Sequence, residues 1–513
     1  MKWVNLTKPN PPVIFLISLY LVYFIFWWLY KLAIMPGLHG DEAWAGLKAI
    51  DFKKNHIHQL SGMNHYTGIL QPYFSSIAFS WFGKGVFQLR IIGPVFNFIG
   101  LLILFFIFKP AQYLRVTLIL FSIIAQSVFL LITPRIAWEV NSFTLFFISL
   151  LLFAVRIIQT NKNSFIQRLG YALFLIVNIL GTYNHVIFSC VSIAGLLGLL
   201  FWSLHNKSLE YKNLIILCSI NALNLLLLFY GMQAEINKLV PVLGYVILII
   251  FFLIIFELYL LYRLTEIKVN NFQITISPFI FTLLSIIFIN CFAYFHGVAF
   301  FQLVTNNKVL LHFFSYDTNF VQSVLYIICG CTYLLFLIKF LIQDILNPAK
   351  AIFAWVIISY FGLFSLYTTN CSFRYYLSIL IISSVYIALK FNQHPKGIYI
   401  FYIIMTLTTL SINKNLFDIF INEHRIVKPV YFNMGNGVME TSAHFLPNKP
   451  VIDFLKRNKT QVITYGSNRY FLEQPIKFYY SIKPWVKTAN KAATIDYDFE
   501  SFGNGYQLFN TSY

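Results

Sequence analysis

The chain alternates long apolar runs with short polar segments along most of its length. The runs are close to the ~20 residues that an α-helix needs to cross a bilayer, and they are too continuous for the strands of a membrane barrel. A helix also satisfies its own backbone hydrogen bonds in lipid. The pattern therefore predicts an α-helical polytopic membrane protein with about 13 transmembrane helices. They are expected near residues 13–33, 88–108, 113–132, 141–158, 167–182, 186–203, 213–230, 241–262, 273–295, 321–339, 351–367, 375–390 and 397–412.

Composition and charge agree with this class and orient the protein in the membrane. Hydrophobic residues make up 58% of the chain and charged residues 11%, while the formal net charge is +19. Many Lys and Arg side chains lie between apolar runs, as Arg156, Lys162 and Arg168 do, so the positive-inside rule explains them without nucleic acid. With a cytoplasmic N-terminus, the rule places residues 34–87 and 413–513 outside. We expect a multi-pass protein of the inner (cytoplasmic) membrane with its active face in the periplasm.

Two regions follow from the position of the last apolar run. Residues 1–412 form the predicted transmembrane region, and residues 413–513 are predicted to form a small α/β domain outside the cytoplasm. The second region carries a β-rich run at 461–465 between expected helices at 451–457 and 469–480. No glycine-rich nucleotide loop occurs, which argues against a nucleotide-driven machine in the cytoplasm. The six cysteines lie in or beside apolar runs and indicate neither a disulfide framework nor a thiolate metal site.

Two adjacent carboxylates, Asp41 and Glu42, follow directly on the first apolar run. They open a long amphipathic outer segment, residues 34–87, that is expected to lie on the membrane surface. An ionisable residue beside a membrane span is a functional candidate. Asp41 is equally suited to cap a helix that starts at Glu42, because Asp is a favoured N-cap residue. Both roles are compatible with each other.

Further polar residues gather in the predicted outer turns, and together with the first loop they carry a family resemblance. The motifs are Asp41-Glu42, Pro72-Tyr73, Trp81-Phe82-Gly83, Leu89-Arg90, Thr133-Pro134-Arg135, Trp138-Glu139, Tyr183-Asn184-His185, Arg374-Tyr375-Tyr376-Leu377 and Lys477 to Tyr480. Their order along the chain resembles that of GT-C membrane glycosyltransferases, most closely the protein O-mannosyltransferases and the lipid A aminoarabinose transferases. The resemblance covers nearly the whole chain, including its C-terminal helix-strand-helix.

The resemblance implies an enzyme that transfers a sugar on the outer face of the membrane. Nucleotide sugars are not supplied there, so the donor is expected to be a sugar linked through phosphate to a polyprenol. We expect Asp41 to act as the general base in a single displacement with inversion, with Glu42 beside it. Cations would steady the departing lipid phosphate, and the predicted ones are Lys84, Arg90, Arg135 and Arg374. Predicted to bind the substrate are Trp44, Tyr66, Trp138, Glu139 and His185.

Each of these roles has a structural alternative. The three arginines would also serve as interfacial anchors, and most of the aromatic side chains face lipid. One Asp-Glu pair without a second acidic cluster argues against an obligatory metal, so no cofactor is predicted, although Glu139, Asp317 or a histidine could complete a divalent-metal site. The motif His56-x-His58 in a polar loop is more often simply solvated.

The acceptor and the function class have alternatives as well. A lipid A phosphate, an envelope glycan hydroxyl or a Ser/Thr of a secreted protein could enter from the outer side, and the basic balance also suits anionic membrane lipids. We favour lipid A or an envelope glycan, with a protein O-mannosyltransferase as the alternative. A transporter or flippase of lipid-linked glycans would share the intramembrane charges, but the inverted repeats with broken helices that typify transporters are not evident.

The predicted topology can be tested by labelling a cysteine placed in the C-terminal region. With Ser467→Cys in a background lacking the native cysteines, a membrane-impermeant maleimide should label intact cells, because 413–513 is predicted to lie outside. A cysteine in the loop that carries Lys162 should react only after the membrane is permeabilised. Labelling of Ser467→Cys only from the cytoplasmic side would overturn the topology.

Overall fold

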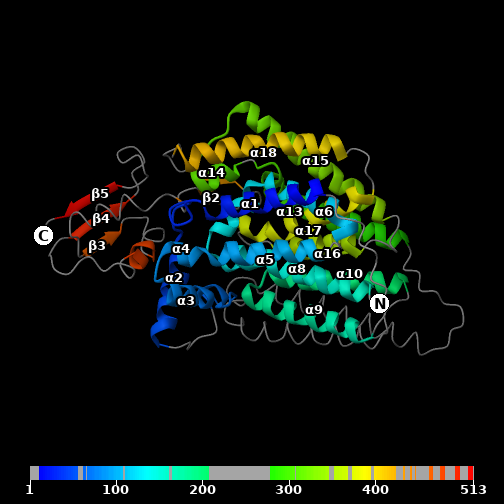
Figure 1. Cartoon of the computed structure of the whole chain (residues 1–513), viewed down its shortest axis with the longest axis horizontal. Helices are drawn as coiled ribbons and strands as arrows, with labels where there is room; N and C mark the ends of the chain where they lie inside the picture. Colours follow the sequence, from blue (N-terminus) through cyan, green and yellow to red (C-terminus); the bar gives the residue numbers. More distant parts are fainter. Residues whose placement is uncertain are drawn as a thin grey trace, which may run out of the picture.

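The computed structural model is dominated by helices that run side by side along the long axis of the molecule (Figure 1). The described residues fall into ten main stretches and seven short pieces of the C-terminal segment. The main stretches are 11–55, 62–64, 66–107, 110–160, 164–206, 278–306, 308–345, 352–367, 372–393 and 398–422. The short pieces are 431–433, 439–441, 445, 462–465, 474–479, 492–496 and 507–511.

Long apolar helices alternate along the chain with short connecting helices and turns. In the first half they are α1 (Pro11–Leu29), α2 (Gly40–Asn55), α3 (Leu70–Phe82), α4 (Val86–Arg90), α5 (Ile92–Ile107), α6 (Pro110–Ala125), α7 (Val128–Ile132), η1 (Thr133–Arg135), α8 (Glu139–Thr160), α9 (Ser164–Asn184) and α10 (Phe188–Asn206). In the second half they are α13 (Pro278–Val304), α14 (Val309–Phe314), α15 (Phe320–Ile345), α16 (Ile352–Ser365), η3 (Phe373–Tyr376), α17 (Leu377–Gln393) and α18 (Ile398–Phe420).

Within the described part of the chain, eight helices are long and apolar enough to cross a membrane, or nine if the bent pair α6 and α7 counts as one span. The prediction of a multi-pass α-helical membrane protein is therefore confirmed. Two shorter apolar helices, Phe188–Leu200 and Ile352–Ser365, occupy two more of the predicted spans. The predicted spans at 213–230 and 241–262 lie outside the described residues, so the total of about 13 stays a prediction.

One predicted span is broken rather than straight. Residues 113–132 were expected to form a single helix, but α6 and α7 meet at 87°. Backbone groups freed by such a break need partners where no water is available. The side chain of Asn306 provides a hydrogen-bond donor and an acceptor for these groups. Its Oδ1 accepts from Val128 N at 2.8 Å, and its Nδ2 donates to Gln126 O at 2.8 Å. Ser127 caps the new helix by accepting from Leu130 N.

The antiparallel pair α8 and α9 gives the bundle a defined polarity. Glu139 begins α8 and Asn184 ends α9, and the Asn184 Nδ2 donates to Glu139 O at 2.9 Å. Arg156 of α8 and Arg168 of α9 lie toward the opposite ends of these helices. On α8, the 17-residue separation of Glu139 and Arg156 corresponds to about 26 Å along the helix axis. On α8 and α9, the acidic Glu139 and the basic Arg156 and Arg168 therefore lie toward opposite ends.

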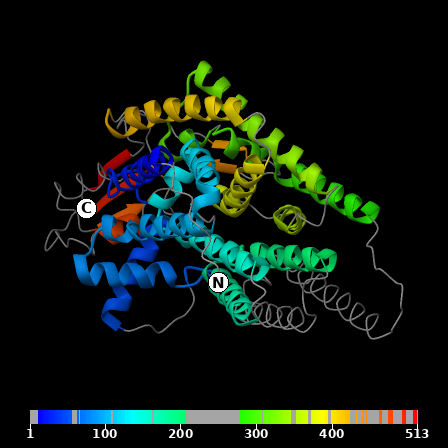
Figure 2. The same ribbon diagram turned by 45° about the vertical axis from the view of Figure 1, so that its right-hand side comes forward.

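The amphipathic first loop folds into helices at one end of the bundle. α2 and α3 pack against each other there, and the short α4 leads directly into α5 (Figures 1 and 2). At its tip, Trp81 and Phe82 leave 75% and 69% of their surface exposed. Large exposed aromatic groups of this kind suit a position in the membrane interface, as the sequence indicates for residues 34–87.

The C-terminal segment lies at the same end of the bundle as α2 and α3 (Figures 1 and 2). β1 (Tyr431–Asn433) and β2 (Met439–Thr441) pair antiparallel. β3 (Val462–Tyr465) runs parallel to β4 (Ala492–Asp496), which pairs antiparallel with β5 (Gln507–Thr511). β3 and the helical residues 474–479 fall within the predicted strand and second helix, while the predicted helix at 451–457 lies outside the described residues. α18 continues to Phe420, past the predicted boundary at 412.

The Phe478 side chain packs the helical residues 474–479 against α2. Phe478 is fully buried and packs with Ala43, Ala49 and Phe79 in a small hydrophobic cluster. Its ring lies directly against Gly46, where the absence of a side chain allows the close approach. The C-terminal segment is therefore packed against the helix that carries Asp41 and Glu42.

Gly46→Ala should loosen this contact. Alanine in place of glycine stabilises a helix by about 1 kcal/mol. Its Cβ would, however, overlap the buried Phe478 ring, and such overpacking typically destabilises the folded state by about 1–3 kcal/mol. We therefore expect faster limited proteolysis of the C-terminal segment in Gly46→Ala. The double variant Gly46→Ala/Phe478→Leu should recover part of the protection, and unchanged cleavage in the single variant would contradict the contact.

Candidate active site

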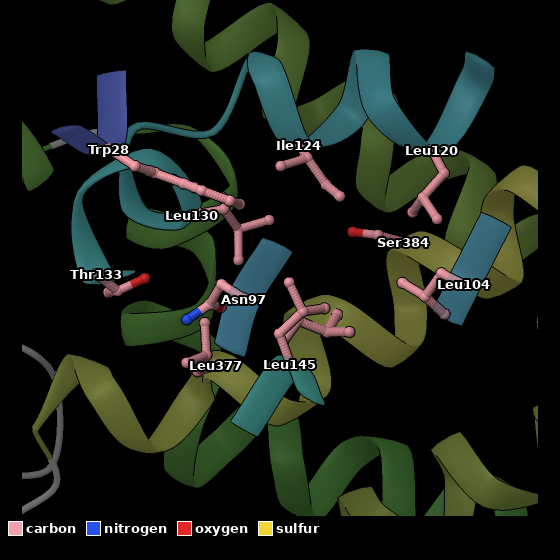
Figure 3. A pocket seen from close by; sticks show the side chains of 11 residues that line it. Trp28, Asn97, Leu104, Leu120, Ile124, Leu130, Thr133, Leu145, Leu377 and Ser384 are labelled. Atoms are coloured by element: carbon pink, nitrogen blue, oxygen red, sulfur yellow. The ribbon is translucent and has the colours of Figure 1, made fainter. Parts of the chain in front are cut away.

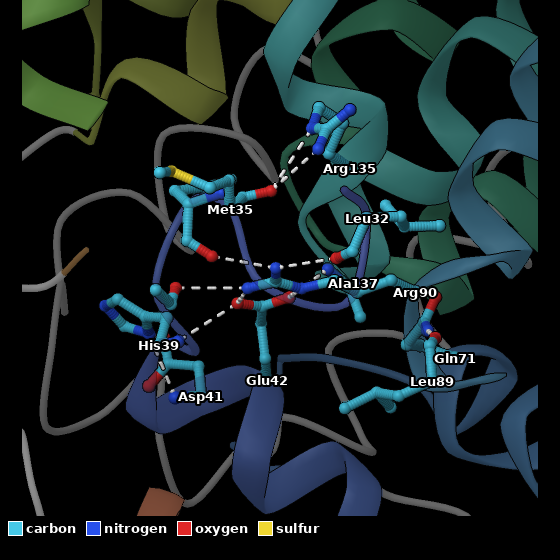
Figure 4. A network of polar contacts seen from close by, with 12 residues as sticks. Leu32, Met35, His39, Asp41, Glu42, Gln71, Leu89, Arg90, Arg135 and Ala137 are labelled. Atoms are coloured by element: carbon cyan, nitrogen blue, oxygen red, sulfur yellow. Dashed lines mark hydrogen bonds and ion pairs between the residues drawn. The ribbon is translucent and has the colours of Figure 1, made fainter. Parts of the chain in front are cut away.

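The two adjacent acids at the start of α2 point into different environments (Figure 4). Glu42 is fully buried and forms a bidentate ion pair with Arg90, at 2.9 Å from Oε1 to Nε and 2.8 Å from Oε2 to Nη2. Its oxygens also accept from the backbone N–H groups of Ala137 at 2.7 Å and His39 at 3.0 Å. Glu42 thus joins the first outer loop, α4 and the turn before α8.

Arg90 has no donor left for a ligand. The guanidinium has five N–H donors. Two bind Glu42, and the others donate to Leu32 O at 3.1 Å, Pro36 O at 2.8 Å and Gly37 O at 3.0 Å. The sequence predicts that Arg90 binds the donor phosphate, whereas this geometry is that of a structural ion pair that fixes the chain between α1 and α2.

Arg135 occupies a similar structural position. It is fully buried, donates to Met35 O at 2.9 Å and to Tyr30 O at 2.6 Å, and also bonds Trp27 O. Its guanidinium carbon lies 4.6 Å from the centre of the Phe420 ring. Arg135 therefore ties η1 to the carbonyl end of α1 and to α18. The predicted phosphate contact does not match this geometry either.

Asp41 meets the remaining arginine. Its Oδ2 lies 3.3 Å from Nη1 of Arg374, which comes from η3 at the start of α17. The two side chains are 15% and 14% exposed, in contrast to the fully buried Glu42 and Arg90. The backbone N–H of Asp41 donates to His39 Nδ1 at 3.0 Å, which fixes the first turn of α2. Of the predicted acids and cations, Asp41 and Arg374 are the pair that borders solvent.

Arg374 lies between aromatic rings and keeps unused hydrogen-bonding capacity. Its guanidinium carbon is 4.4 Å from the Trp138 ring centre and 5.3 Å from that of Tyr375. Nε of Arg374 and Nε1 of Trp138 are both buried, and neither has a hydrogen-bond partner among the residues that the structure describes. Unpaired buried donors are costly unless a ligand satisfies them. This stacked pair therefore presents two open donors beside Asp41.

Tyr66 and His185 complete the same cluster. An isolated antiparallel bridge joins Thr67 to His185 and brings the Tyr66 ring to 5.5 Å from the imidazole, which lies 5.3 Å from Tyr375. Burial raises the pKa of Tyr66, as do the negative charges of Glu139 and Asp41, while Arg374 opposes this rise. Tyr66, His185, Tyr375 and Arg374 therefore lie together near Asp41.

The C-terminal segment contributes Phe445, which packs against the site residues and was not predicted from the sequence. Phe445 is buried, its backbone O accepts from Gly37 N at 2.8 Å, and its ring lies 5.4 Å from His39 and 5.8 Å from Trp138. The His312 ring is a further neighbour at 5.1 Å. No motif distinguishes Phe445 from the other aromatic residues, so its role follows from tertiary packing alone.

His39 is uncharged in this environment. Burial lowers its pKa well below the usual value, and the positive charge of Arg374, the nearby His312 and the charge of Arg90 act in the same direction. A neutral His39 is consistent with its Nδ1 accepting a hydrogen bond from Asp41 N. It therefore serves as a hydrogen-bonding support for the loop rather than as a cation.

The other predicted site residues lie at the edge of this cluster or away from it. Trp44 is half-buried one turn beyond Asp41 on α2. Lys84 is half-buried in the turn between α3 and α4 and makes no ion pair with any described residue. Among the described residues, no group of three or more His, Cys, Asp or Glu side chains could hold a metal ion. His56, His58 and His65 lie outside the described residues.

An apolar cavity lies within the bundle next to these elements (Figure 3). Its volume is about 10 Å³, roughly enough for one water molecule, and most of its lining is aliphatic. Leu377 belongs to the first turn of α17, directly after the η3 turn that carries Arg374, and Thr133 begins the turn that carries Arg135. The remaining lining residues are Trp28, Asn97, Leu104, Leu120, Ile124, Leu130, Leu145, Ile381 and Ser384.

Comparison with known proteins finds similarity among solved structures. No protein-family model and no curated protein matches the sequence. The chain is similar to ArnT from Cupriavidus metallidurans bound to undecaprenyl phosphate, at 9% identity and a TM-score of 0.39, over 95% of this chain and 93% of that one. It is also similar to the oligosaccharyltransferase AglB from Archaeoglobus fulgidus, in complex with an inhibitory peptide and a dolichol-phosphate, at 12% identity and a TM-score of 0.47, over 94% of this chain and 69% of that one.

A second structure of the Archaeoglobus fulgidus oligosaccharyltransferase, in complex with Zn and sulfate, has 12% identity and a TM-score of 0.49, over 93% of this chain and 67% of that one. At such identities and scores these similarities assign neither an activity nor any site residue to this chain.

The different environments of Glu42 and Asp41 can be tested by measuring the thermal stability of variants. Glu42→Gln would leave Arg90 buried without a counter-charge, and loss of one partner of a buried pair typically costs about 3–5 kcal/mol. We expect a clearly lower thermal unfolding midpoint in detergent. Asp41→Asn, whose partner is partly exposed, should change the midpoint much less. Equal losses in the two variants would contradict the structural role of Glu42.

Proposed function

We propose that this protein is an integral-membrane glycosyltransferase that moves a sugar from a polyprenyl-phosphate donor to an acceptor on the outer face of the membrane. The observation that carries the proposal is the partly exposed pair of Asp41 and Arg374. A carboxylate and a guanidinium at the membrane surface supply a proton acceptor and a phosphate ligand within one site. The open donors of Arg374 and Trp138 support it.

In the proposed reaction Asp41 acts as the general base. It takes the proton of an acceptor hydroxyl while that oxygen forms a bond to the anomeric carbon of the sugar. The bond from this carbon to the phosphate oxygen breaks, and its electron pair leaves with the lipid phosphate. One displacement of this kind inverts the configuration at the anomeric carbon. An acceptor that is itself a phosphate needs no base, and Asp41 would then orient Arg374 and the sugar.

Arg374 stabilises the charge that develops on the leaving phosphate. Guanidinium groups bind phosphate oxygens with paired N–H donors, and Nε of Arg374 has no partner within the described ranges of the chain. The rings of Trp138 and Tyr375 hold the guanidinium in place. A fixed donor of this kind needs no reorganisation as charge develops.

The other residues take supporting roles in this proposal. Glu42 and Arg90 fix the loop from which Asp41 projects, and Arg135 fixes the end of α1. Tyr66 and Glu139 border the space in front of Asp41 and Arg374, where hydroxyls of a sugar would find hydrogen-bonding partners. Trp44 offers an aromatic face at the edge of the site, and Lys84 would act only as a distant positive charge.

We favour a lipid-linked donor over a soluble one because nucleotide sugars are not supplied on the outer face of the membrane. A donor carried by the membrane also suits a site at the end of a helical bundle. Lipid A or an envelope glycan is the proposed acceptor, and mass spectrometry of lipid A, envelope glycans and secreted proteins, with and without the gene, would identify it.

Asp41→Asn should abolish transfer without unfolding the protein. Loss of a general base typically lowers the rate about 10²- to 10⁴-fold, whereas the fold depends on Glu42 instead. The measurement is sugar transfer in membranes supplied with polyprenyl phosphate-sugar, or restoration in cells of the glycan change found by mass spectrometry.

Asp51→Asn is the matched control, because Asp51 lies exposed on the same helix and loses the same charge. Its activity should equal that of the wild type. Near-normal transfer by Asp41→Asn would eliminate the catalytic role of Asp41.

A further inference from the structure

The turn that carries His185 is held rigidly at the edge of the site. Gly68 N donates to Asn184 O at 3.1 Å, and Val186 N donates to Tyr66 O at 3.1 Å. Asn184 also ties the turn to the first residue of α8 through its bond to Glu139 O. A side chain on such a turn has little freedom to move, so His185 is preorganised.

The local hydrogen bonding fixes the tautomer of His185. Its Nδ1 accepts from the backbone N–H of Ile187 at 3.1 Å, so Nδ1 carries no proton. Burial lowers the pKa of the imidazole well below its usual value, and the positive charge of Arg374 adds to this effect. The ring is therefore neutral, with its single proton on Nε2.

This Nε2–H group has no partner in the described part of the chain. His185 is only 3% exposed, and its Nε2 is buried without a hydrogen bond. The ring lies between those of Tyr66 and Tyr375, and Tyr375 in turn contacts the Arg374 guanidinium. An unsatisfied buried donor costs about 1–3 kcal/mol, so its retention in a rigid turn beside Arg374 points to a ligand.

We propose that His185 donates a hydrogen bond from Nε2 to a phosphate oxygen of the polyprenyl-phosphate donor, next to Arg374. This inference rests on the proposed function and assigns one contact within it. Among the buried groups without a partner in the described part of the chain, His185 Nε2, Arg374 Nε and Trp138 Nε1 are donors that lie close together near Asp41. A phosphate offers only acceptors to them, whereas sugar hydroxyls both donate and accept and are better served by Asp41 and Glu139.

Two substitutions separate this role from a purely structural one. In His185→Asn, the side-chain oxygen can accept from Ile187 N–H as in an ordinary Asx-turn, so the turn is kept while the distal donor is lost. In His185→Gln, the amide N–H group reaches close to the position of Nε2, so the donor is largely kept and the turn contact is weakened. A structural role predicts the opposite order of effects.

The test uses the full-length protein in detergent and undecaprenyl phosphate, which contains the lipid phosphate but no sugar. Equilibrium binding is measured for the wild type and both variants, with thermal unfolding midpoints as a measure of folding. We expect His185→Asn to unfold like the wild type and to bind about 10- to 100-fold more weakly, as loss of one hydrogen bond to a charged group implies. His185→Gln should bind more tightly than His185→Asn.

The outcomes distinguish this inference from the function on which it rests. Wild-type affinity in a folded His185→Asn variant would overturn the phosphate contact and leave the proposed function intact. A loss that appears only in the KM for the sugar-bearing donor would also overturn it, because His185 would then bind the sugar. Absence of binding by the wild type would count against the polyprenyl-phosphate donor itself.

Discussion

The fully buried ion pair between Glu42 and Arg90 is the interaction on which the site depends. Two charges without exposure are stable only if nearly every donor and acceptor is satisfied, and here the carbonyls at 32, 36 and 37 and the N–H groups at 39 and 137 complete the set. The pair thereby fixes the start of α2, the end of α4 and the turn before α8. Asp41 gains its position at the site through this fixed frame.

Segments far apart in the chain supply the rest of the site. Arg374 lies 333 residues from Asp41, and Phe445 and Phe478 bring the C-terminal segment against the first outer loop. Charges in such a setting interact strongly because little water separates them. His185, Trp138 and Arg374 each hold a buried donor without a partner in the described part of the chain, and these three side chains cluster near Asp41.

The bundle meets the same demand for satisfied polar groups away from the site. The sharp break between α6 and α7 frees backbone groups, and one side chain, Asn306, binds those on both sides of it. Arg135 performs a similar task where α1 ends. These polar residues stabilise irregular backbone between membrane helices, whereas Asp41 and Arg374 are partly exposed. Exposure and unused donors, not charge alone, separate the two groups.

The sequence by itself determined the class, the position of most apolar helices and the presence of an acid at the membrane boundary, because these depend on local composition and run length. The family resemblance pointed to Asp41 as the base, but the sequence did not determine that Glu42 is buried against Arg90 while Asp41 is partly exposed, because adjacent helical residues point about 100° apart and the burial of either face depends on its surroundings. The sequence also did not distinguish the environment of Arg374 from those of Arg90 and Arg135, and it did not indicate the contacts that Phe445 and Asn306 make. Those distinctions depend on partners distant in sequence, which only the tertiary structure brings together.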